Sequence, residues 1–140
     1  MFKNILVPLD GSPASLRALD MAIEFSMKDG SKLTLIYVVA PPPFCNVKEF
    51  IEEMSKVGRS VLDMACAKCE CAGLTSRKLL KIAESNRTST ANEIVREAID
   101  GHYDCVILGS RGYSGEMGIL MGSVAVSAAI SLPCTTIIVR

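Results

Sequence analysis

The sequence has few aromatic residues and no net charge, and both facts exclude classes of protein. Tryptophan is absent, aromatic residues make up 5% of the 140 residues, and 15 basic residues balance 15 acidic ones. A neutral chain has no overall field that would attract nucleic acid or an anionic membrane. The core must be aliphatic, and a hydrophobic content of 49% is enough to build one. We therefore expect one domain over residues 1–140, a length that buries about two-thirds of the unfolded surface.

Long apolar runs are also missing. The first run, Ile5–Val7, stops at Pro8, and no run reaches the roughly 18 apolar residues that a membrane span needs. A secretory signal would need a longer apolar stretch and a small-residue cleavage site. We expect a cytoplasmic protein that binds neither membrane nor nucleic acid, and whose six cysteines stay mostly reduced.

Short apolar runs alternate along the chain with segments of helical period. Five runs predict strands, at Ile5–Val7, Leu33–Val39, Leu79–Ile82, Cys105–Leu108 and Thr135–Val139. Four segments predict helices, at Pro13–Asp29, Val47–Cys71, Ser89 or Thr90 to Gly101, and about Ser123–Ser131. Ser12 can cap the first helix, because proline at the first helical position loses no hydrogen bond.

This alternation predicts the fold class. Strands that are apolar on both faces and joined by helical crossovers form a parallel sheet covered on both sides. We expect a single α/β domain of three layers, Rossmann-like or flavodoxin-like, with five parallel strands in the order 3-2-1-4-5. Ligands then bind beyond the carboxyl ends of the strands, where the strand order reverses. Here that crevice lies between Asp10, after the first strand, and Gly109, after the fourth.

The segment Gly109–Ser123 carries the strongest functional signal. It holds five glycines and three serines and leads into a helix. Glycine lets backbone N–H groups approach an anion closely, and a helix N-terminus favours negative charge. The segment contains no lysine, so it is not a Walker A loop, and it is not in the first βα turn, where the dinucleotide fingerprint belongs. The alternative is that these glycines only permit a long turn.

The same segment resembles a known nucleotide-binding motif. The spacing Gly109-x-x-Gly112, then nine residues, then Gly122-Ser123, resembles the motif of the universal stress protein family. The similarity extends along the chain, through Lys3–Ser12, Leu35–Val38, Asp104–Gly112 and Leu132–Cys134.

The resemblance implies ATP, AMP or ADP in the crevice, with or without Mg²⁺. It implies that Asp10 contacts the ribose, that the backbone of Val38 meets adenine, and that Pro8 and Leu108 wall the pocket. It implies that the ribose and phosphates are held by Gly109, Arg111, Gly112, Gly122, Ser123 and Val124.

The family also implies a homodimer and a regulatory role. The dimer would pair through the last strand, Thr135–Val139, because an apolar edge strand needs covering. Two segments depart from the family pattern: Thr88–Thr90 stands where Gly-x-Pro is common, and Pro41–Pro43 lies on the adenine side, where it could alter base preference.

Two other functions stay open. A slow Mg²⁺-dependent ATPase, or another adenine-nucleotide enzyme, would use Asp10 and Ser123, but no further group suits phosphoryl transfer, so we expect at most weak hydrolysis. A thiol or zinc sensor would use Cys66, Cys69 and Cys71, of which the first two have a metal-site spacing. The only histidine, His102, falls at the amino end of the sheet, opposite the crevice.

Overall fold

The computed structural model describes residues 1–43, 45–83, 89–112 and 121–140. Five strands form one parallel sheet: β1 Asn4–Pro8, β2 Lys32–Val39, β3 Ser76–Ile82, β4 Cys105–Gly109 and β5 Thr135–Val139. Four helices connect them: α1 Pro13–Asp29, α2 Val47–Cys71, α3 Thr90–Asp100 and α4 Ser123–Ser131. The sheet order is β3-β2-β1-β4-β5, which confirms the predicted topology.

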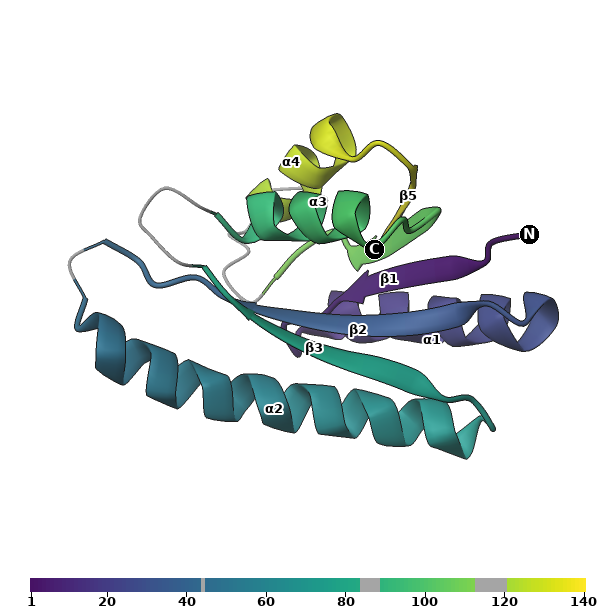
Figure 1. Ribbon diagram of the computed structural model, residues 1–140, viewed down its shortest axis with the longest axis horizontal. Coiled ribbons are helices and arrows are strands. Elements are labelled where there is room, and N and C mark those ends of the chain that lie inside the picture. The colour runs from purple at the N-terminus through teal and green to yellow at the C-terminus, as the bar shows by residue number, and fades with distance from the viewer. Residues whose placement is uncertain (44, 84–88, 113–120) are drawn as a thin grey trace.

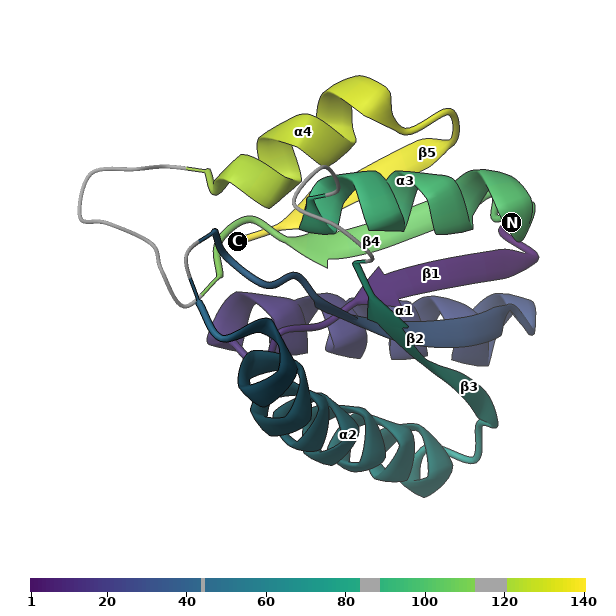
Figure 2. The ribbon, with the colours of Figure 1, turned by 60° about the vertical axis from the view of Figure 1, so that its left-hand side comes forward.

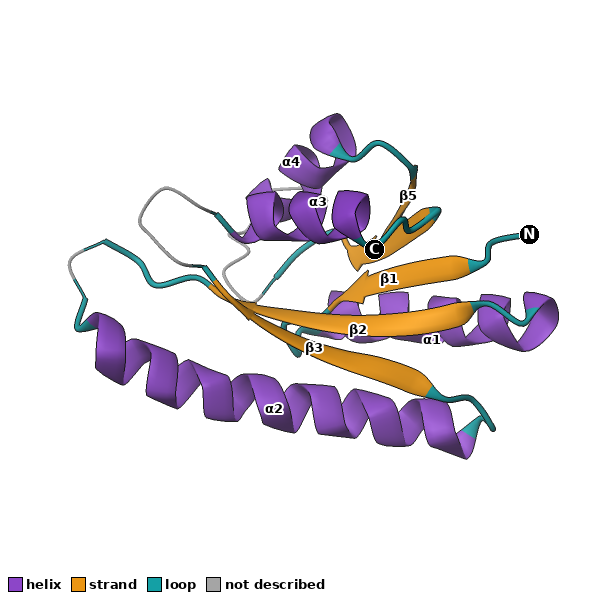
Figure 3. Cartoon of the chain, in the orientation of Figure 1, coloured by secondary structure: helices purple, strands orange, loops and turns teal. Residues whose placement is uncertain are grey.

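The domain has three layers, with α1 and α2 on one face of the sheet and α3 and α4 on the other (Figures 1 and 3). Side chains alternate between the faces along each strand. On β1, Ile5 and Val7 enter the core under α1 and α2, whereas Leu6 enters the core under α3 and α4. The two central strands β1 and β4 are therefore buried on both sides, as their unbroken apolar runs predict.

Helix boundaries follow from local capping. Ser12 caps α1 through its side chain, which accepts from the N–H of Ser15, and Pro13 occupies the first helical position. The helix ends at Gly30, whose φ of 72° is in the left-handed region that favours glycine. Asn46 and Ser89 cap α2 and α3 in the same way as Ser12. None of the helices in the described ranges is long and apolar enough to cross a bilayer.

The third strand is longer than the apolar pattern predicts. The run Leu79–Ile82 marks only its second half, and the strand begins at Ser76. Arg77 and Lys78 are exposed because β3 lies at the edge of the sheet. Charged residues on an edge strand oppose pairing with another chain, which explains why this half carries no apolar signal.

Candidate functional site

The candidate site lies between β1 and β4, where the strand order of the sheet reverses. Strands β1 and β4 are neighbours, and the chain leaves β1 for α1 on one face and β4 for α4 on the other. Figure 2 shows the carboxyl ends of these strands pointing toward the same edge of the molecule. Asp10 follows β1 and Arg111 follows β4, so the structure places both at the predicted crevice.

Two contacts join the turn after β1 to the loop after β4. One oxygen of the Asp10 carboxylate accepts the N–H of Ser12 at 2.8 Å. The hydroxyl of Ser12 donates to the carbonyl of Arg111 at 3.3 Å. A Cβ atom on Gly112 would lie 2.6 Å from the other oxygen of Asp10, so a side chain there would displace the carboxylate. The sequence predicts Ser12 only as a helix cap, because nothing local indicates its hydrogen bond to a loop 99 residues later.

The other two glycines of the motif meet different surroundings. A Cβ on Gly109 would lie 2.7 Å from backbone atoms of Ala14 and Ser15, so this glycine is needed for α1 to pack against β4. At Gly122 the nearest atom to a Cβ is the Ser110 carbonyl oxygen at 3.4 Å, and φ is −72°. A side chain would fit at Gly122, and the fold alone gives no reason for glycine there.

Helix α4 begins without a side-chain cap, unlike the other three helices. Its first internal bond runs from the N–H of Val126 to the carbonyl of Gly122. Within the described ranges nothing accepts from the N–H groups of Ser123, Val124 and Ala125. These donors and the positive end of the helix dipole form an anion-binding arrangement beside the loop.

The N–H of Gly122 already has an acceptor in the protein. It donates to the Ser110 carbonyl at 2.6 Å. Ser110 is buried, so this bond holds the start of α4 against the end of β4. The donors available to an anion therefore begin one residue later, and they include Ala125, which follows from the start of the helix at Ser123.

The remaining predicted side chains differ in how far they are buried. Arg111 is exposed, and no carboxylate in the described parts of the chain pairs with it. Leu108 is 2% exposed and Val124 is half-buried in the same core, so their side chains form the wall beneath the site. Pro8 and Val38 are half-buried at the carboxyl ends of β1 and β2.

Part of the predicted motif falls outside the described residues. Residues 113–120, which include Ser114, Gly115, Glu116 and Gly118, belong to this group. So does Thr88, the first residue of the departure from the family pattern before α3. The site is therefore built here from the two ends of the loop, Gly109–Gly112 and Met121–Ser123.

The cysteines do not converge on a metal site. All six are free, and Cys69 is buried, Cys66 is half-buried and Cys71 is exposed. Burial raises the pKa of the Cys69 thiol, which disfavours the thiolate that a metal needs. No group of three or more candidate ligand side chains gathers anywhere in the described parts of the chain. His102 is exposed, with φ of 54°, in the turn before β4 at the amino end, where we expected it.

The whole chain, residues 1–140, matches the model of the universal stress protein family. The chain belongs to the universal stress protein family. Among curated members, it is 30% identical over 146 residues to "Universal stress protein MJ0531" of Methanocaldococcus jannaschii, covering 100% of this chain and 83% of that one. It is 27% identical over 153 residues to "Universal stress protein YxiE" of Bacillus subtilis, with 100% of both chains covered.

Solved structures of this family share the fold. The universal stress protein UspA of Lactobacillus plantarum superimposes with a TM-score of 0.86 at 19% identity, over 99% of this chain and 97% of that one. A universal stress protein of Archaeoglobus fulgidus solved with dAMP gives 0.74 at 18% identity, over 99% and 98% of the chains. A member from Arabidopsis thaliana with AMP bound gives 0.69 at 16%, over 98% and 90%. Another was solved in complex with cAMP and gives 0.77 at 22%, over 99% and 97%. The last three of these structures contain adenine nucleotides.

Proposed function

We propose that this universal stress protein binds ATP in the crevice between β1 and β4 and acts as a regulatory protein with little or no turnover. The observation that carries the proposal is the uncapped start of α4. Three backbone donors there have no acceptor within the described ranges, and they adjoin the loop that passes over Asp10. The adenine nucleotides of the related structures support a nucleotide as the anion.

In this proposal each end of the nucleotide has its own set of residues. The phosphates bind the N–H groups of Ser123, Val124 and Ala125, with the hydroxyl of Ser123 and the guanidinium of Arg111 beside them. The protein itself would tolerate a Cβ at Gly122. In this proposal Gly122 is glycine because a side chain there would fill the space through which a phosphate oxygen reaches the N–H groups of α4. Asp10 binds the ribose, and the backbone near Val38 binds adenine, with Pro8 and Leu108 as walls.

Little turnover is expected because the described residues supply few catalytic groups. Mg²⁺ would bind phosphate oxygens together with the Asp10 carboxylate and the Ser123 hydroxyl, since this cation prefers oxygen ligands. Phosphoryl transfer also needs a group that orients the attacking water, and the described residues beside Asp10 provide no obvious one. Steady release of phosphate at many equivalents per hour would favour the slow ATPase instead.

The proposal includes a homodimer that pairs through β5. This strand is at the edge of the sheet, and its apolar residues Ile137–Val139 are only half-buried. Next to it on α4, Ile130 is 80% exposed and Val126 is 41% exposed. Covering this apolar edge would remove a surface that otherwise favours aggregation. A sedimentation experiment that finds only monomer at micromolar concentration would contradict the dimer.

A cytoplasmic location is part of the same proposal. The six cysteines are all free, which suits a reducing compartment.

The test is the response of thermal stability to ATP. A ligand that binds only the folded state stabilises it by about 2.7 kcal/mol at about a hundred times its Kd. The double variant Gly122→Val with Ser123→Val should lose this response and keep its fold, because φ and ψ of Gly122 suit any residue and Ser123 is exposed. Ser127→Val, on an exposed position of the same helix, is the matched control. An unchanged response in the double variant would overturn the proposal.

A further inference from the structure

A cavity of about 660 Å³ opens at the opposite end of the sheet from the proposed nucleotide site. It is lined by the first residues of β1, β2 and β3 and by the three connections that enter β2, β3 and β4. Its size is within the range of sites that bind small molecules. The proposed nucleotide site lies at the carboxyl ends of the strands, so the two sites share no residue.

Register places four polar side chains of this cavity on one face of the sheet. Asn4 on β1 pairs with Lys32 on β2, and Thr34 pairs with Arg77 on β3. Lys32 and Thr34 are two residues apart on one strand and so project to the same face. This is the face that α3 covers, since Leu6 and Ile36 of the same strands pack against α3. These four polar side chains lie just beyond the C-terminal end of α3, where Gly101 also lines the cavity.

The charged residues that line the cavity are both cations. They are Lys32 and Arg77, and no carboxylate is among the lining residues. Neither cation has an ion-pair partner in the described parts of the chain. Lys32 is a compact point charge, whereas the guanidinium of Arg77 can bind a carboxylate or phosphate through two parallel hydrogen bonds.

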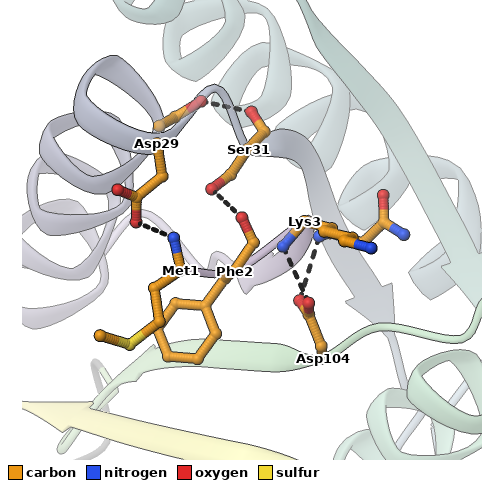
Figure 4. A network of polar contacts seen from close by, with 8 residues as sticks. Met1, Phe2, Lys3, Asp29, Ser31 and Asp104 are labelled. Atoms are coloured by element: carbon orange, nitrogen blue, oxygen red, sulfur yellow. Dashed lines mark hydrogen bonds and ion pairs between the residues drawn. The ribbon is translucent and has the colours of Figure 1, made fainter.

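Two acidic groups near this end already have partners. Asp104 accepts the backbone N–H groups of Lys3 and Asn4 at 2.8 and 3.0 Å, as Figure 4 shows. Glu97 accepts from the hydroxyl of Tyr103 at 3.2 Å and pairs with Lys81 at 3.8 Å. These two carboxylates are held by other groups, and neither forms an ion pair with Lys32 or Arg77.

The rest of the lining is rich in hydrogen-bonding groups. The side-chain amide of Asn4 has no hydrogen-bond partner within the described ranges, and Thr75 adds a hydroxyl group just before β3. Burial raises the pKa of Tyr103, with Glu97 adding to the shift and the Thr34 hydroxyl opposing it. The phenol of Tyr103 therefore stays neutral at physiological pH and remains a hydrogen-bonding wall of the cavity.

We propose that this cavity binds a small organic anion, a carboxylate or a phosphate ester with a polar body, through Arg77 and Lys32. The volume exceeds that of a bare ion, and the amide and hydroxyl groups suit the polar body of such a molecule. The proposal is independent of nucleotide binding, because no residue of the crevice takes part.

The test is a titration of the nucleotide-free protein with succinate and in a separate arm with inorganic phosphate. Backbone ¹H–¹⁵N shifts should move and saturate at Asn4, Lys32, Thr34 and Arg77, with a Kd in the millimolar range or tighter. The two arms distinguish carboxylate from phosphate recognition. Shifts at Ser123, Val124 and Ala125 report separately on anions at the α4 N-terminus, and the assay can be repeated with the double variant at that helix. Failure of one proposal therefore does not hide the other.

Two neighbouring residues provide a matched pair of variants. Arg77→Gln should weaken binding about tenfold, because a charged hydrogen-bonding partner is lost. Lys78→Gln removes the same charge from the next residue, which points to the other face and pairs with Asp63, and should leave the affinity within about twofold. Equal weakening in both variants would indicate a general charge effect, and shifts that do not saturate would indicate no site; either result would overturn the proposal.

Discussion

The two ends of the sheet use their polar groups differently. At the amino end, side chains and the terminus hold β1 in place: Asp104 binds two backbone N–H groups, the Ser31 hydroxyl donates to the Phe2 carbonyl at 2.6 Å, and the Met1 ammonium pairs with Asp29 at 2.7 Å (Figure 4). At the carboxyl end, α4 starts with three N–H groups that nothing in the described ranges accepts. The groups around β1 at the amino end stabilise the fold beside the cavity that Lys32 and Arg77 line, whereas the start of α4 leaves backbone donors for a nucleotide.

The largest expected effect separates two glycines of the motif. Gly109→Ala should destabilise the protein by about 3 kcal/mol, because the added Cβ would meet the backbone of Ala14 and Ser15 at 2.7 Å. Gly122→Ala should change stability by no more than about 0.5 kcal/mol, because its Cβ has room. Urea unfolding of both variants measures the difference. Equal stability of the two would show that the motif glycines do not have these separate roles.

At the amino end, Asp104→Ala should destabilise the protein by about 2 kcal/mol, because two backbone donors lose a charged acceptor. Its response to ATP should match that of the wild type, since Asp104 is at the other end of the sheet. Asp100→Ala, an exposed carboxylate at the end of α3, is the control and should have little effect. If Asp104→Ala lost its response to ATP at temperatures where it is folded, the two ends of the sheet would not act independently.

At the carboxyl end a substitution should affect ATP binding more than stability. Asp10→Ala removes one acceptor, that of the Ser12 N–H, and should cost about 1 kcal/mol of stability. Its affinity for ATP should fall about tenfold or more, because the ribose loses a charged hydrogen-bond acceptor. Glu24→Ala, on an exposed position of α1, controls for the loss of charge. Isothermal calorimetry that gives equal affinities for Asp10→Ala and the wild type would remove Asp10 from the site.

The last prediction concerns a buried thiol of β4 and an effect that appears only at alkaline pH. Burial raises the pKa of Cys105 from 9.0 to about 12, so in the folded state the thiol keeps its proton at pH values where the unfolded chain loses it. The stability that this residue contributes should be constant below pH 9 and fall as pH rises from 9 toward 12. The difference in unfolding free energy between the wild type and Cys105→Ala measures it. A difference that stays constant between pH 8 and pH 10 would contradict the shift.

Much of the fold is readable in the sequence because its signals are local. Ser12-Pro13 fixes the start of α1, and the apolar runs of β1 and β4 identify buried parallel strands, which in turn place the crevice. The start of β3 is not readable, because an edge strand can expose Arg77 and carries no apolar run there. Strand order then follows because right-handed crossovers allow only a few topologies for such a chain.

The site is only partly readable for a different reason. Sequence spacing selects the glycines, but it does not say which neighbour each one meets. The contact of Gly109 with α1 and the bond from Gly122 to Ser110 depend on how segments far apart in the chain pack together. The motif therefore predicts where an anion binds, and the packing decides which N–H groups are available to it.

The most direct test is to map where ATP binds, by following backbone ¹H–¹⁵N shifts during an ATP titration. Saturable shifts are expected at Asp10, Arg111, Ser123, Val124 and Ala125, at ATP concentrations below those that shift Lys32 or Arg77. Shifts confined to the amino end, or the absence of any saturable shift, would contradict a nucleotide site between β1 and β4.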